Sequence, residues 1–310
     1  MKTLYLAKEP GMGVRDDLSR LSKDEVVVVA CNGYADWYRK KGYNCISKTK
    51  YFELDGTMRF DVVIGNPPFQ APNLTGKRGK GGNNSLYIKF IEGGIEVTKD
   101  GGRLSLVTPP AALIKSTVLN QPTPTLKKLM ASGSFDMIDL SAGENFSVGS
   151  FISRWEWVKG KKQGKVKVVS KDCVRMMDIE DIFYLPPVFT DLELNLYKKI
   201  ISNKSGDRLV VVRDKPGQDC TMERFGYPKV QIGGNGVLGF KEEHYEFLSS
   251  KLGLWLLDYV RRHDQMIYHN ALTGIHIPDG GFTLTKEELQ HVNSNQWVNF
   301  SKKEHEEQTQ

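Results

Sequence analysis

The stretch from residue 60 to residue 69 limits what this chain can fold into, because it runs from a buried strand directly into a rigid turn. Its Val-Val-Ile run at 62–64 is β-branched throughout, which predicts a strand covered on both faces of a parallel sheet. Gly65 allows a close backbone approach, and Pro67 and Pro68 then fix φ and remove two N–H donors. Such a turn at the end of a central strand lies where α/β sheets bind ligands.

The same turn carries groups that suit an amino group on a planar base. Asn66 offers a side-chain carbonyl, Pro67 offers a backbone carbonyl, and Phe69 offers a flat apolar surface. Two converging acceptors beside an aromatic plane form a site for an exocyclic amine. An ordinary strand-to-loop turn that happens to contain Asn-Pro-Pro is the alternative, because short motifs also occur by chance.

The run from Asp61 to Phe69 resembles the catalytic motif of S-adenosylmethionine-dependent amino-methyltransferases, especially the N6-adenine DNA methyltransferases. Residues 101–109, 135–140 and 146–153 resemble later strands of that family in the same order, so the resemblance covers about the first half of the chain. It implies a Rossmann-like, doubly wound, mostly parallel α/β sheet, the class I methyltransferase fold. The catalytic residues that it implies are Asn66, Pro67, Pro68 and Phe69.

The pattern of the first half independently predicts such a sheet. Strands are expected at 3–7, 26–30 and 43–47, with helices at 14–21 and 35–41 between them. Strands that alternate with helices imply right-handed crossovers and parallel pairing. Further along the chain, we expect helices at 86–97 and 126–130 and strands at 104–107, 135–140 and 151–158. The last strand alternates polar and apolar residues, which favours a position near a sheet edge.

The resemblance places the cofactor loop directly after the first strand, where a glycine turn and a helix N-terminus can approach S-adenosylmethionine. This loop is degenerate. Arg15 stands where the family usually has glycine, Asn32 where it has an acidic residue, and Lys48 where an acidic or polar residue is common; the family's extra N-terminal cofactor element looks missing. A plain βαβ turn with a weakened or lost cofactor site is the alternative. The implied cofactor-binding residues are Glu9, Pro10, Gly11, Gly13, Asn32 and Asn66.

A segment rich in Gly and Asn follows the turn, from residue 70 to residue 84, and it predicts a surface loop. It carries three cations, Lys77, Arg78 and Lys80, directly after the predicted catalytic turn. A basic loop in this place could hold the phosphates beside an extruded nucleotide. A loop whose charges are merely solvated is the alternative.

The sequence predicts a domain boundary at the Gly/Lys-rich linker near residue 160, so that residues 1–160 form the methyltransferase domain. Residues 161–300 would form a smaller α+β domain, which in the resembling family recognises the target. We expect residues 301–310 to be a disordered tail. In this half, short strands are predicted at 166–169, 209–212, 230–232 and 237–240, and helices at 192–201 and 243–262.

The composition narrows the class of protein. A net charge of +6 and a pI near 8.9 are compatible with a polyanionic partner. The four cysteines form no CxxC pair, and the six histidines, all beyond residue 240, lack metal-ligand spacing, so no metal site is predicted. We find no apolar run of membrane-spanning length and no signal peptide, and we expect a cytoplasmic protein of a bacterial or bacteriophage-infected cell.

Taken together, the resemblance implies site-specific N6-methylation of a flipped adenine in double-stranded DNA, with S-adenosylmethionine as cofactor, and it allows for a cognate restriction endonuclease as partner. Amino-methylation of RNA bases or of a protein glutamine uses a similar turn, and N4-cytosine methylation is chemically close. A catalytically weak or inactive methyltransferase-like protein, with a DNA-binding or anti-restriction role, is the alternative from a different class. The degenerate cofactor loop favours that reading.

Overall fold

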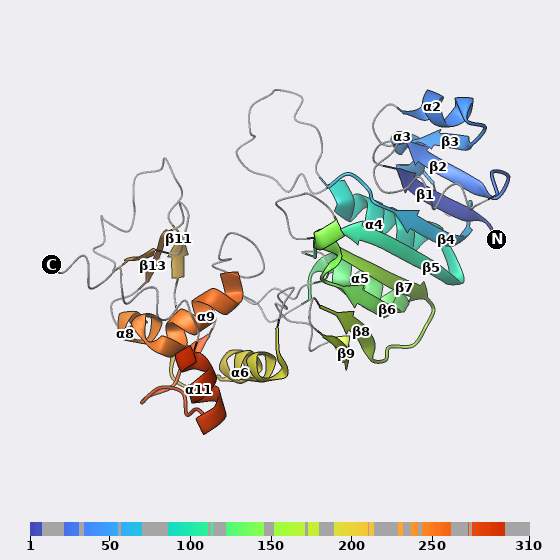
Figure 1. The fold of residues 1–310 in the computed structure, drawn as a ribbon. Coiled ribbons are helices and arrows are strands. Elements are labelled where there is room, and N and C mark those ends of the chain that lie inside the picture. Colours follow the sequence, from blue (N-terminus) through green and yellow to red (C-terminus); the bar gives the residue numbers. More distant parts are fainter. Residues whose placement is uncertain are drawn as a thin grey trace. The chain divides into compact units, whose positions relative to one another are not determined.

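The computed structural model of the chain consists of two compact units (Figure 1). The first comprises residues 1–114, 122–169 and 174–181, and the second comprises 115–121, 170–173 and 182–310. The residues described are 1–7, 22–30, 34–54, 57–69, 86–110, 113, 122–145, 152–170, 173–179, 189–209, 211–213, 229–231, 237–240, 244–261, 272 and 275–294.

The described part of the first unit is built on a nine-stranded sheet with the order β3-β2-β1-β4-β5-β7-β6-β8-β9. Neighbouring strands from β3 to β5 are parallel, whereas β7 runs antiparallel to β5 and β6, and β9 antiparallel to β8. The doubly wound, mostly parallel α/β prediction is therefore confirmed. The strands are β1 Thr3–Ala7, β2 Val26–Ala30, β3 Asn44–Ser47, β4 Phe60–Gly65, β5 Thr98–Thr108, β6 Gly133–Asp139, β7 Ser153–Lys159, β8 Val166–Val169 and β9 Val174–Met177. The sheet continues past residue 160, where the sequence predicts a domain boundary.

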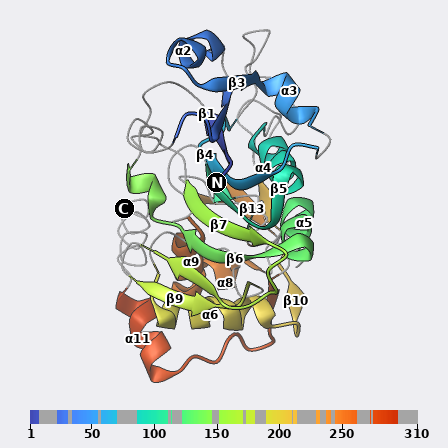
Figure 2. The same ribbon diagram turned by 90° about the vertical axis from the view of Figure 1, so that its right-hand side faces the viewer.

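Helices pack on both faces of this sheet. On one face lie α4 and α5 (Figure 2); the Leu104 side chain of β5 lies directly beneath Gly94 of α4, and the Trp157 indole of β7 donates to the Leu129 carbonyl of α5 at 3.0 Å. On the other face, Tyr38 of α2 joins a buried cluster formed by β1, β2 and β3. The helices are α2 Ala35–Lys40, α3 Lys48–Phe52, α4 Leu86–Val97 and α5 Pro124–Ser132, followed by the short 3₁₀ helix η2 Ala142–Asn145.

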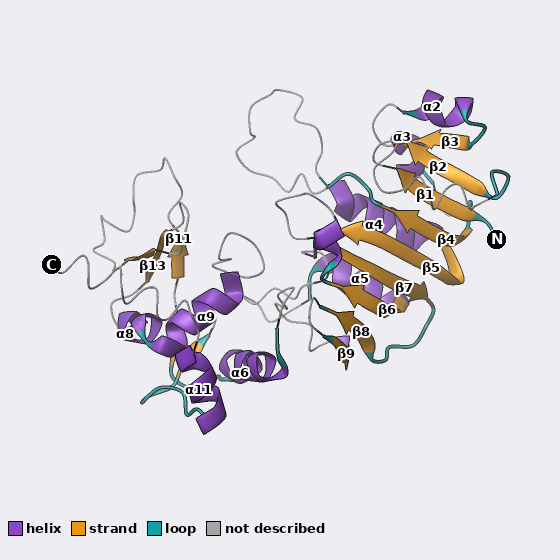
Figure 3. Cartoon of the chain, viewed as in Figure 1, coloured by secondary structure: helices purple, strands orange, loops and turns teal. Residues whose placement is uncertain are grey.

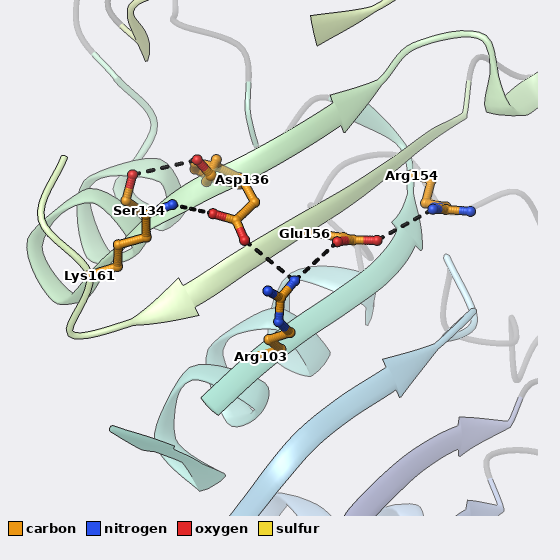
Figure 4. A network of polar contacts seen from close by, with 7 residues as sticks. Arg103, Ser134, Asp136, Arg154, Glu156 and Lys161 are labelled. Atoms are coloured by element: carbon orange, nitrogen blue, oxygen red, sulfur yellow. Dashed lines mark hydrogen bonds and ion pairs between the residues drawn. The ribbon is translucent and has the colours of Figure 1, made fainter. Parts of the chain in front are cut away.

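The prediction that the strand at 151–158 lies near a sheet edge is wrong, because β7 lies between β5 and β6. Its alternation instead separates two faces: Trp155 and Trp157 are fully buried, while Arg154 and Glu156 belong to a charged network on the opposite face (Figure 4). Antiparallel strands commonly have one face packed and one face polar, so the pattern does not by itself indicate an edge.

The charged network joins three strands. Arg103 of β5 lies 3.4 Å from the Asp136 carboxylate of β6 and 3.5 Å from the Glu156 carboxylate of β7 (Figure 4). Arg154 pairs with Glu156 at 3.3 Å, and Lys161 pairs with Asp136. Each carboxylate thus has two cationic neighbours, and the polar side of the strands is held by ion pairs across the sheet.

The second unit contains helices α6 Asp191–Ser202, α8 Tyr245–Ser249, α9 Lys251–Arg261 and α11 Lys286–Ser294 (Figure 3). The single helix predicted at 243–262 is wrong, because Ser250 takes an extended conformation and its hydroxyl accepts from the Gly253 amide, which caps α9. The strands described in the second unit are β10 Asp207–Arg208, β11 Val211–Arg213, β12 Lys229–Gln231, β13 Val237–Phe240 and β14 His276–Ile277.

The tail at 301–310 lies outside the described residues. Among the helices that the structure describes, none combines the length and the apolar character needed to cross a membrane.

Asp61 fixes the start of β4 against its neighbours. Its carboxylate accepts from the Lys2 amide, just before β1, at 2.6 Å and from the Lys99 ammonium of β5 at 2.7 Å. The hydrogen bond from Lys99, followed by that from Lys2, holds the pKa of Asp61 below its usual value. The strand that ends in the predicted catalytic turn is thereby anchored to β1 and to β5 at its beginning.

We expect Asp61→Asn to lower the melting temperature at neutral pH, because the neutral amide cannot form the ion pair with Lys99. A carboxylate with a lowered folded pKa contributes its full stability above the unfolded pKa of about 3.9 and loses it as the pH falls further. The difference between wild type and variant should therefore shrink below about pH 4. Thermal unfolding measured from pH 7 to pH 3 tests this. Asp36→Asn is the matched control, since Asp36 is 83% exposed in its pair with Arg39; a pH-independent difference for Asp61→Asn would contradict the assignment.

Candidate active site

The predicted catalytic turn begins where β4 ends between β1 and β5. Gly65 pairs with Leu6 on one side and with Leu106 on the other, and the Asn66 amide still donates to the Leu6 carbonyl at 3.2 Å. A Cβ atom on Gly65 would lie 2.2 Å from the Leu6 carbonyl oxygen, and Gly65 has a φ of +154°. Only glycine fits here without moving β1, so the close approach anticipated for this position is present.

The side-chain oxygen of Asn66 is the main polar feature of the turn. Oδ1 is buried, and among the described residues it has no hydrogen-bond partner. An unsatisfied buried acceptor costs about 1–3 kcal/mol, and buried side-chain oxygens without partners are uncommon in folded proteins. The backbone of Asn66 is fixed to β1, and its side-chain oxygen can accept a hydrogen bond from a ligand N–H.

The rest of the motif follows Asn66 directly in the chain. Pro67 and Pro68 are buried, and Phe69 is half-buried. The ring of Phe69 contacts that of Tyr87 in α4, with a centroid distance of 6.4 Å and an interplanar angle of 82°. The turn therefore has a rigid two-proline segment, one unsatisfied acceptor and one partly exposed aromatic ring.

The end of the neighbouring strand β5 is fixed by side chains that the sequence did not single out. The Trp155 indole donates to the Thr108 hydroxyl at 2.9 Å, and the Ser153 hydroxyl donates to the Thr108 carbonyl at 3.1 Å. All three residues are fully buried. Because β5 pairs with β4 up to Gly65, these bonds hold the strand that flanks the turn. Nothing in the linear sequence pairs Thr108 with Trp155.

Several predicted site residues lie outside the described part of the chain. The predicted cofactor loop follows β1, and Asn32 follows β2; the last residues of these strands, Ala7 and Ala30, pair with each other. The two predicted segments therefore start at the carboxyl ends of neighbouring parallel strands, on the side of the sheet where β4 also ends. The predicted site residues that lie outside the described part of the chain are Glu9, Pro10, Gly11, Gly13, Asn32, Lys77, Arg78 and Lys80.

The strand order also contains a reversal of the winding direction. The chain adds β2 and β3 on one side of β1, and then β4 and β5 on the other, so the winding direction reverses between β1 and β4. In open α/β sheets, ligands bind at the carboxyl ends of the strands at such a reversal. Among the described residues, Ala7, after which the cofactor loop is expected, and Asn66 both lie beside that reversal, which is compatible with a nucleotide-like cofactor.

The order β3-β2-β1-β4-β5-β7-β6, with β7 antiparallel, defines the class I methyltransferase fold. Within this fold, residues 13–134 match the family of Eco57I restriction-modification methylases. The match covers less than half of the chain and includes the strand β4 and the Asn-Pro-Pro-Phe turn. The resemblance to DNA methyltransferases is thereby confirmed, as a match of this segment to restriction-modification methylases.

Solved structures of restriction-modification proteins are similar to parts of this chain. The methyltransferase subunit of a type I restriction-modification system from Streptococcus thermophilus is 19% identical, with a TM-score of 0.39, over 58% of this chain and 46% of that protein. The M protein of the type I restriction enzyme EcoKI is 13% identical, with a TM-score of 0.38, over 64% and 49%. The type IIG restriction endonuclease BpuSI is 16% identical, with a TM-score of 0.37, over 66% and 26%.

The matched regions thus span half or less of these proteins' own length. The fold assignment rests on the strand order and not on these likenesses. No curated protein sequence matches this chain.

We expect Gly65→Ala to destabilise the first unit by about 2 kcal/mol or more, because the new methyl group would overlap the Leu6 carbonyl and force β1 and β4 apart. Chemical denaturation measures this difference. The control is Gly101→Ala, since Gly101 also has a positive φ, +74°, but its Cβ would have no neighbour within 4 Å. Equal losses in the two variants would show that backbone strain, and not the close contact, makes Gly65 necessary.

Proposed function

We propose that this protein transfers a methyl group from S-adenosylmethionine to the N6 amino group of an adenine in double-stranded DNA. The observation that carries the proposal is the buried, unsatisfied Oδ1 of Asn66 at the end of β4. The match of residues 13–134 to a restriction-modification methylase family supports DNA as the substrate. The choice of adenine rests on the Asn-Pro-Pro-Phe turn.

The turn acts by accepting hydrogen bonds from the amine. The N6 lone pair of adenine is delocalised into the ring, so the amine is a poor nucleophile. Oδ1 of Asn66 and the carbonyl of Pro67 each accept one N–H, which draws the nitrogen toward tetrahedral geometry and frees its lone pair. S-adenosylmethionine, when bound, supplies an electrophilic methyl group. The remaining acceleration comes from positioning, and the fixed backbone of the turn favours it.

The base must leave the duplex to reach this acceptor. In the proposal, Phe69 holds the flipped adenine by stacking on its plane. The cations Lys77, Arg78 and Lys80 hold flanking phosphates, and the second unit contributes target recognition. S-adenosylmethionine is held by Glu9, Pro10, Gly11, Gly13 and Asn32 together with Asn66. A restriction endonuclease of the same specificity is the partner that fits the matched family.

Asn66→Ala should lower methyl transfer by at least about 100-fold, the loss seen when one preorganised hydrogen-bonding group is removed from an active site. It should leave the melting temperature unchanged or raise it, because the acceptor that it removes has no described partner. The measurement is transfer of a tritiated methyl group to unmethylated DNA. Asn44→Ala is the control, since Asn44 is exposed at the opposite, amino end of β3 and should keep full activity.

Near wild-type transfer by Asn66→Ala would contradict the assigned chemistry. The same assay distinguishes the alternative reactions, which are methylation of RNA bases, of a protein glutamine and of cytosine N4. Its substrates are then RNA, glutamine-containing peptides and DNA whose adenines are replaced by N6-methyladenine. Transfer to the N6-methylated DNA would indicate cytosine as the target base.

Asn32→Asp should tighten the binding of S-adenosylmethionine. A carboxylate that accepts from the ribose hydroxyls makes charge-assisted bonds roughly twice as strong as those of a neutral amide. Isothermal calorimetry with wild type and variant measures the change. Absence of binding heat in both folded proteins would favour a non-enzymatic, DNA-binding role over the proposed reaction.

A further inference from the structure

We infer that Tyr87 is a positioning residue for the target base, acting through the ring of Phe69. The inference rests on the proposed function. The Tyr87 ring is nearly buried, with 7% exposure, and contacts the Phe69 ring at a centroid distance of 6.4 Å. Phe69 and Tyr87 are 18 positions apart in sequence, and this contact connects the catalytic turn to helix α4.

The geometry of the pair shows how much of the Phe69 ring Tyr87 itself covers. The two rings are nearly perpendicular, at 82°. In such a pair, the edge of one ring points at one face of the other. If the edge of Tyr87 points at Phe69, the Tyr87 ring covers one face of Phe69. If the edge of Phe69 points at Tyr87, the Tyr87 ring covers neither face of Phe69. Tyr87 can therefore hold the orientation of Phe69 without taking the place of the base.

Helix α4 is a rigid support for this contact. On one side, a Cβ on Gly93 would lie 2.8 Å from the Tyr51 hydroxyl, and on the other a Cβ on Gly94 would lie 2.8 Å from the Leu104 side chain. The helix is therefore closely packed against α3 and β5. Precise sites need supporting side chains on rigid elements, and α4 supplies such an element.

The C-terminal end of α4 is fixed as well. The Lys159 ammonium of β7 donates to the Ile95 carbonyl at 2.7 Å, the Arg59 guanidinium donates to the Glu96 carbonyl, and the Thr98 hydroxyl donates to the Gly94 carbonyl at 2.6 Å. Cations at a helix C-terminus also interact favourably with the helix dipole. Tyr87 thus lies in the first turn of a helix that is fixed at its other end.

A double-mutant cycle tests the inference. Tyr87→Leu should lower kcat for methyl transfer about two- to tenfold, the range that an aromatic pair contributes beyond its buried area. It should leave the KM for S-adenosylmethionine unchanged. In a Phe69→Ala background, Tyr87→Leu should have no further effect on kcat, because the ring through which it acts is gone. Tyr87→Phe, which keeps the ring pair, should restore wild-type kcat.

Phe90→Leu is the matched control. Phe90 is a fully buried aromatic residue of the same helix, and its ring stacks on that of Tyr51. Its loss should destabilise the helix packing at least as much as Tyr87→Leu does, with kcat unchanged. If Tyr87→Leu fails to fold, Tyr87→Met, which fills the space with a flexible side chain, takes its place in the cycle.

The outcomes separate this inference from the proposed function. If wild type transfers methyl groups but Tyr87→Leu lowers kcat equally with and without Phe69, or not at all, the positioning role is wrong and the proposed function stands. A loss of kcat in Phe90→Leu as large as that in Tyr87→Leu also overturns the role. If wild type transfers no methyl group to any DNA, the proposed function fails, and the role of Tyr87 fails with it.

Discussion

The backbone contact between β4 and β1 is the constraint on which the rest of the site depends. Because Gly65 has no side chain, its main chain lies against the Leu6 carbonyl, and the pairing extends through Asn66 before the prolines end it. The backbone position of Asn66 is therefore set by the sheet. At the other end of the strand, the Asp61 carboxylate links β4 to Lys2 and Lys99. The pairing of β4 therefore also determines the backbone geometry of the site.

Local chemistry predicted much of this arrangement, and long-range packing accounts for the rest. The β-branched run before Gly65 indicated a buried strand, and the apolar stripe at 86–97 predicted α4 with the bounds that the structure has. Both signals are contained in short stretches of sequence. The position of β7 inside the sheet, the break at Ser250 and the contact of Tyr87 with Phe69 depend on partners distant in sequence or on one side-chain cap. Periodicity does not encode such partners.

The two parts of the sheet are stabilised differently, and β5 belongs to both. On its β4 side it continues the parallel pairing that carries the turn, and on its β7 side it begins the antiparallel part. There, one face is packed by Trp155 and Trp157, and the other is held by the ion pairs of Arg103. The hydrogen bonds to Thr108 fix the end of β5, so that the antiparallel part supports the strand beside the turn.

The unsatisfied oxygen of Asn66 has a consequence for selection. Position 65 is restricted by folding alone, because any side chain there would collide with β1. Position 66 faces the opposite pressure, since an apolar residue would relieve the cost of a buried acceptor. A lineage maintained only for its fold or for adhesion to DNA would gain stability by losing this asparagine. In the proposed function, the amino group of the target base supplies the missing donor, so that binding of the base offsets the cost of this buried acceptor.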